Sequence, residues 1–237
     1  MAPPFMRQMG LRQAEIGRQL LQQITQAGIS LEIIYSFVII TISLMIYFGT
    51  REFYKLSSHK GIKYFRLSFL FFAISFFFRY FVKLFSFFDF SSVFSQSLFV
   101  SIFGFISLYT SAMAVFYLVY SVMWKKWNEE SLLVIHLLVA ITALIAVLIS
   151  NSLIILSIYI VLFIFVSIVT WISYKESRAE KKKSHLHGIY ILLFIFWLLN
   201  IIDLLIPNIL GTFQLLVYLA SIGIFLSILY KVLRKVG

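Results

Sequence analysis

The 237-residue sequence contains no cysteine and few charged residues. Without cysteine it has no disulfide framework, no thiolate site and no palmitoylation site. Charged residues make up 12% of the chain, about half of the ~25% typical of soluble domains, whereas 62% of the residues are hydrophobic. Mean hydropathy is +1.00. This composition excludes soluble globular, disordered, collagen-like and nucleic-acid-binding proteins and predicts an integral membrane protein.

The common catalytic motifs are also missing. No HExxH, GxSxG, P-loop or GxGxxG pattern occurs, and the last apolar run has no lysine that would anchor a retinal Schiff base. His185 and His187 form a weak pair, because a zinc site needs three or four ligands. We therefore expect neither a metal nor a cofactor, and the motifs give no reason to propose an enzyme.

Apolar runs predict seven transmembrane helices. Each crossing of the ~30 Å hydrocarbon layer needs about 20 apolar residues in a helix. The predicted spans are approximately 31–48, 62–87, 98–124, 131–150, 152–174, 189–206 and 212–231. Residues 131–174 carry no charge and are too many for one crossing, so the polar cluster Ser150–Asn151–Ser152 predicts a tight turn. The expected fold is an all-α membrane bundle of about seven helices, with loops too short for a soluble domain.

Basic residues predict the orientation of this bundle. Most of the 20 lysine and arginine residues lie in the first, third and fifth connections and at the C-terminus. Because positive charge is enriched in cytoplasmic loops, this distribution predicts an N-terminus outside, a C-terminus in the cytoplasm and a multi-pass protein of the cell membrane. Such loops also explain the formal net charge of +11. The expected partner is therefore the lipid bilayer and not nucleic acid.

The first 30 residues differ in composition from the rest. Residues 1–30 are rich in glutamine and arginine, whereas residues 31–237 contain all seven predicted spans. Leu20, Ile24, Ala27 and Leu31 recur at helical spacing, which is typical of an amphipathic helix at a membrane surface. The alternative, slightly favoured, is a polar lead-in without a role of its own.

Polar side chains near one end of the predicted spans form the candidate site. Arg79 and Asp203 lie at similar depth near the outer ends of the second and sixth spans, with Asn200 one turn inside Asp203 and Glu32 at the start of the first span. Because charge in hydrocarbon is costly, this cluster is either an ion or ligand site that opens outward or a structural salt bridge. The salt bridge is favoured, since side chains this close to a helix end reach water.

The third span carries a pattern of small residues. Gly104, Ser107, Ser111 and Ala114 recur every three or four residues, which allows close helix approach in lipid and predicts a packing face. His136 is the one histidine inside a predicted span. Haem with two axial histidines would need a second one at matching depth, so we expect His136 to be hydrogen-bonded instead.

The fifth connection is strongly basic. Its lysine and arginine residues are Lys175, Arg178, Lys181, Lys182 and Lys183. They are placed to contact anionic lipid headgroups or an acidic cytoplasmic partner, each contributing about 1 kcal/mol near a charged leaflet. A cytoplasmic loop carries such residues in any case, so topology alone is the favoured explanation.

Three functions are compatible with these features. The favoured one is a receptor- or sensor-like module, or a subunit of a larger membrane complex, because catalytic motifs are missing and aromatic residues surround several spans. The alternative is an ion or small-solute channel or transporter, although the polar residues gather at one side instead of following a path. A lipid-modifying enzyme comes last, since Arg79 and Asp203 make a poor acid–base pair. Other membrane subunits or further copies of the chain stay open as partners.

Overall fold

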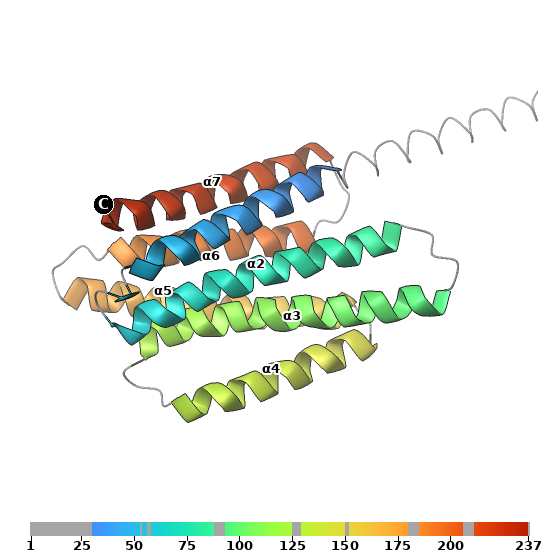
Figure 1. Ribbon diagram of the computed structural model, residues 1–237, viewed down its shortest axis with the longest axis horizontal. Coiled ribbons are helices and arrows are strands. Elements are labelled where there is room, and N and C mark those ends of the chain that lie inside the picture. The colour runs from blue at the N-terminus through green and yellow to red at the C-terminus, as the bar shows by residue number, and fades with distance from the viewer. Residues whose placement is uncertain are drawn as a thin grey trace, which may run out of the picture.

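The computed structural model describes residues 30–52, 54–55, 58–87, 93–124, 129–149, 152–179, 185–205 and 211–236. These residues form seven α-helices and no strand. A first helix, Ser30–Glu52, is followed by α2 (Lys60–Phe87), α3 (Val93–Met123), α4 (Glu129–Ile149), α5 (Ser152–Ala179), α6 (His185–Leu205) and α7 (Gly211–Val236). In Figure 1 the helices run roughly along the long axis of the molecule, as expected for a bundle.

Six of these helices are long and apolar enough to cross a bilayer. Their apolar segments are Ser30–Glu52, Lys60–Val82, Ser97–Met123, Glu130–Ile149, Leu153–Lys175 and Gln214–Arg234. The apolar stretch of α6 within the described residues, His187–Ile202, is shorter. The structure therefore supports a multi-pass helical membrane bundle, while a seventh crossing by α6 stays a prediction.

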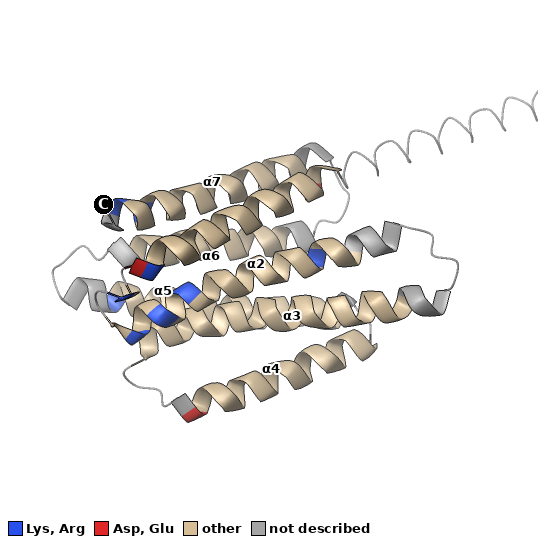
Figure 2. Ribbon diagram, in the orientation of Figure 1, with Lys and Arg blue, Asp and Glu red and all other residues tan. Residues whose placement is uncertain are grey.

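Basic side chains are concentrated at one end of the bundle. Figure 2 shows the described lysine and arginine residues mainly near the end that holds the C-terminus, with one basic residue farther along α2. The orientation of the bundle in a membrane still rests on the sequence argument. The amphipathic helix predicted within residues 1–30 lies outside the described residues.

The uncharged stretch of the sequence folds as two helices. α4 ends at Ile149 and α5 begins at Ser152. α4 packs on α3, whereas α5 packs on α3 and, more extensively, on α6. Much of α4 is exposed, including Leu133 at 71% and Leu148 at 74%. Helix α4 therefore forms one edge of the bundle, as Figure 1 shows.

Aromatic side chains fill the centre of the bundle. Phe72 of α2, Phe196 of α6 and Phe225 of α7 are at most 2% exposed. Ring centroids lie 4.8 Å apart for Phe196 and Phe225 and 6.2 Å apart for Phe72 and Phe196. The first helix joins this core because Tyr35 stacks on Tyr218 of α7 at 4.3 Å. Helices in lipid associate through close packing, so these rings hold four helices together.

Small residues bring α2 and α3 close together. Ser75 Oγ donates a hydrogen bond to the Ser107 carbonyl at 3.0 Å, and Ser107 Oγ donates to the Ser75 carbonyl at 3.2 Å. At the other end of the contact, a Cβ added to Gly61 would lie only 2.8 Å from the Ser121 carbonyl oxygen. The two backbones therefore approach more closely there than a larger residue permits.

A buried arginine links the first helix to α2. Arg66 is 9% exposed, and its Nε donates to the Tyr47 carbonyl at 3.2 Å. Its guanidinium carbon also lies 4.8 Å from the ring centre of Tyr47 and 5.7 Å from that of Tyr54. Sequence reasoning treats this residue only as a topology signal. Its cation–π contacts and hydrogen bond make it a structural contact as well.

Candidate functional site

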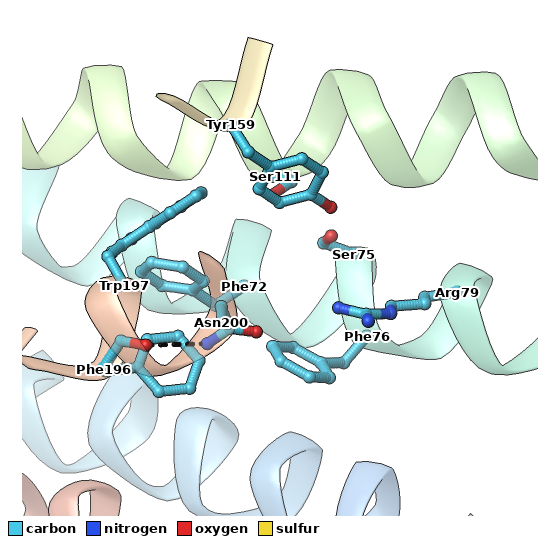
Figure 3. A pocket seen from close by; sticks show the side chains of 9 residues that line it. All are labelled: Phe72, Ser75, Phe76, Arg79, Ser111, Tyr159, Phe196, Trp197 and Asn200. Carbon is cyan, nitrogen blue, oxygen red and sulfur yellow. Dashed lines mark hydrogen bonds between the residues drawn. The ribbon is translucent and has the colours of Figure 1, made fainter. Parts of the chain in front are cut away.

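A small pocket lies between α2, α3, α5 and α6, and Figure 3 shows the side chains that line it. These are Phe72, Ser75, Phe76, Arg79, Ser111, Tyr159, Phe196, Trp197 and Asn200. The cavity measures about 20 Å³. A water molecule needs a cavity of ~10–15 Å³, so this space suits one or two waters or a compact polar group.

Two residues of the predicted cluster meet at this pocket. Arg79 comes from α2 and Asn200 from α6, and Figure 3 shows the guanidinium and the side-chain oxygen of Asn200 pointing toward one another. Asn200 Nδ2 donates to the Phe196 carbonyl at 2.9 Å, which fixes the amide so that its oxygen faces the pocket. Each helix rises ~1.5 Å per residue, so the depths estimated from the sequence already placed these two residues within about one helical turn of each other.

The other two predicted members do not line the pocket in the described residues. Glu32 lies on the first helix and is absent from the pocket wall. Asp203 lies in α6, one turn after Asn200, but its side chain falls outside the described residues. The predicted salt bridge between Arg79 and Asp203 therefore stays a prediction.

Sequence reasoning missed most of the polar wall. Trp197 is 2% exposed, and its Nε1 has no hydrogen-bond partner in the part of the chain that the structure describes. Its ring lies 5.8 Å from that of Tyr159, whose hydroxyl points toward Ser75 in Figure 3. These residues sit inside apolar runs, where one tryptophan or tyrosine looks like any other. Only a buried indole nitrogen without a partner, on a residue that lines a cavity, distinguishes Trp197.

The chemistry of the pocket is that of a binding site. Arg79 supplies positive charge, Trp197 an N–H donor, and Asn200 an acceptor. None of its nine described lining residues is Asp, Glu, His or Cys, so this wall offers no acid–base pair. A compact guest that accepts hydrogen bonds from the arginine and the indole matches these groups best.

A second polar cluster joins α3 and α4. Tyr109 OH lies 2.6 Å from His136 Nδ1, and Tyr117 OH lies 2.9 Å from His136 Nε2. A neutral imidazole donates from one nitrogen and accepts at the other, so both ring nitrogens are used. The prediction that His136 is hydrogen-bonded is confirmed. We call this cluster the Tyr–His–Tyr clasp, because it ties the edge helix α4 to the bundle.

The predicted packing face of α3 contacts several neighbours. Ser107 bonds α2, and Ser111 lines the pocket. A Cβ built on Gly104 would lie 3.9 Å from Val147 of α4, and Ala114 is fully buried. The pattern therefore does not form one interface with one partner.

The predicted basic contact falls largely outside the described residues. Lys175 is exposed near the end of α5. The side chain of Arg178 and the residues Lys181, Lys182 and Lys183 are not described. No three His, Cys, Asp or Glu side chains among the described residues are placed to hold a metal ion.

Comparison with known proteins gives one informative match. A protein of Archaeoglobus fulgidus, described as an uncharacterized protein, is 32% identical over 214 residues, which cover 87% of this chain and 93% of the relative. No family model matches the chain, and neither does any solved structure. The match covers nearly all of both proteins, so the chain belongs to the same family as this archaeal protein.

Proposed function

We propose that the protein is a receptor-like membrane module that binds a small polar ligand in the pocket between α2, α3, α5 and α6. One observation carries this proposal. Trp197 lines the cavity, and its indole N–H is buried without a hydrogen-bond partner in the described residues. A buried donor left without a hydrogen bond costs about 1–3 kcal/mol, and a ligand that accepts from it removes that cost.

The packing next to the pocket favours binding over conduction. Phe72 and Phe196 line the cavity and also pack against Phe225 in the centre of the bundle. A conducting path needs polar groups or an opening along its length. Here the same rings that form the pocket wall are at most 2% exposed, so a channel or transporter is the less favoured alternative.

The position of the pocket is compatible with a receptor. Arg79 lies in the last third of α2 and Asn200 near the end of α6. With the orientation that the basic residues predict, both helices run toward the outside. The pocket then lies in the outer half of the bundle and the basic end faces the cytoplasm, where a signalling partner would bind.

Ligand binding by the full chain in nanodiscs tests the proposal. Thermal unfolding is measured with a panel of compact anions such as formate, nitrate and acetate, and we expect at least one of them to raise Tm. A ligand present at 100 times its Kd stabilises the folded state by about 2.7 kcal/mol. Trp197→Phe keeps a ring but removes the N–H, so it should remove most of the shift. Trp171→Phe is the control, because Trp171 is 69% exposed on α5.

Two results would contradict this function. Ion flux into liposomes that contain the protein would support the channel instead. A Tm shift of equal size in Trp197→Phe and Trp171→Phe would place the ligand away from the pocket.

A further inference from the structure

An apolar groove separates α4 from α5. Leu108, Ala112 and Phe116 of α3 line it, and Val139 of α4 and Ile158 of α5 contribute to the two walls. Its volume is about 400 Å³, within the ~300–1,000 Å³ range of small-molecule sites. The groove exists because α4 and α5, which are consecutive helices, pack on α3 instead of on each other.

The side chains that line the groove need no hydrogen bond from an occupant. Its two hydroxyl side chains both bond within their own helices. Thr142 Oγ1 donates to the Leu138 carbonyl at 2.8 Å, and Ser157 Oγ donates to the Leu153 carbonyl at 2.8 Å. The remaining lining side chains are all hydrocarbon or aromatic. Only an apolar guest matches such a surface, since a polar one would lose its hydrogen bonds on entry.

The groove is continuous with the surface that faces lipid. Leu138 and Val161 line it and are 56% and 50% exposed. They lie within Glu130–Ile149 and Leu153–Lys175, two of the segments apolar enough to cross a bilayer. The hydrocarbon chains of lipids therefore surround the opening of the groove. An empty groove would lack the dispersion contacts that such a chain makes with its walls.

We propose that this groove is a binding site for one hydrocarbon chain of a membrane lipid. This hydrocarbon chain lies between α4 and α5 and fills the space that keeps the two helices apart. This site is separate from the polar pocket and does not depend on the proposed function.

The edges of the groove are held open from α3. Toward the C-terminal end of α4, Ala143 and Ala146 pack against Leu108. Toward the N-terminal end of α4, the Tyr–His–Tyr clasp ties His136 to α3. Helix α4 is thus fixed at both ends of its contact with α3, and its side toward α5 stays available to the lipid chain.

Filling the groove with a side chain tests the site. Ser157→Phe places a ring in the groove. Ser227→Phe on α7 is a matched control, because Ser227 is also exposed and its Oγ donates to the Gly223 carbonyl at 2.8 Å. Each protein is reconstituted in vesicles of palmitoyl-oleoyl phosphatidylglycerol or phosphatidylcholine, extracted in mild detergent, and weighed with its retained lipids by native mass spectrometry.

We expect the wild type and Ser227→Phe to retain one lipid more than Ser157→Phe, with either headgroup, because the groove contacts only the chain. Equal retention in all three proteins overturns the proposal. A dimer mass that Ser157→Phe alone converts to a monomer also overturns it, since the groove would then be covered by a second copy. If Ser157→Phe does not fold, Thr142→Phe enters the groove from the α4 wall and is judged by the same outcomes.

Discussion

Removing one hydroxyl from the Tyr–His–Tyr clasp should loosen α4 by a measurable amount. Tyr117→Phe deletes the group that lies 2.9 Å from His136 Nε2 and changes little else, because Tyr117 is only 7% exposed and its ring stays in place. Hydrogen bonds between membrane helices contribute ~0.6 kcal/mol on average and up to ~1.7 kcal/mol. We therefore expect Tyr117→Phe to lower the free energy of unfolding by about 0.6–1.7 kcal/mol.

The second tyrosine makes the prediction sharper. Tyr109 OH is 2.6 Å from His136 Nδ1, so Tyr109→Phe should cost a similar amount. The double variant leaves both ring nitrogens without a partner from α3, and its loss should be about 1–3 kcal/mol. Reversible unfolding by SDS in bicelles measures these differences. Tyr230→Phe is the control, because Tyr230 is 64% exposed on α7.

Unchanged unfolding of these variants would contradict a stabilising role for the Tyr–His–Tyr clasp. If Tyr109→Phe, Tyr117→Phe and the double variant all unfold at the same SDS fraction as Tyr230→Phe, the hydrogen bonds to His136 do not hold α4. The stability of this edge helix would then rest on apolar contacts alone.

Two further substitutions test the close contacts of α2. Gly61→Ala should destabilise the protein by about 1–3 kcal/mol, because its Cβ would lie 2.8 Å from the Ser121 carbonyl oxygen. The control is Gly223→Ala on α7, where an added Cβ meets nothing within 4 Å. This variant should be neutral or more stable by up to ~1 kcal/mol. Equal Tm changes in the two variants would contradict the close approach of α2 and α3. Arg66→Gln should lower Tm by several degrees, since the buried guanidinium loses its hydrogen bond and its ring contacts, whereas Arg234→Gln, at an exposed position, should leave Tm unchanged in the same scan.

Helices could be predicted from this sequence because their signal is local. Each apolar run holds enough residues to cross hydrocarbon, and the polar residues at 150–152 mark the only place where the long uncharged stretch can turn. The depth of a residue follows from its distance along the helix, which is why Arg79 and Asn200 were expected within about one helical turn of each other in depth. The structure places both on the same pocket.

Rotation about each helix axis could not be predicted. In a soluble protein the hydrophobic face of a helix points inward, but these helices are apolar on all sides and give no such signal. Nothing in the sequence therefore distinguishes Trp197 and Tyr159, which line the pocket, from aromatic residues that face lipid. Arg66 was a basic residue after the first span, and only the structure shows its contacts with Tyr47 and Tyr54.

The polar pocket and the apolar groove meet at one contact between α3 and α5. Ser111 and Tyr159 line the pocket, while Ala112 and Ile158, their neighbours in the chain, line the groove. Any shift of α3 relative to α5 therefore changes the shape of both. If a lipid chain in the groove favours one arrangement of these helices, it changes the affinity of the pocket for its ligand. The ligand then changes the affinity of the groove for the lipid by the same factor.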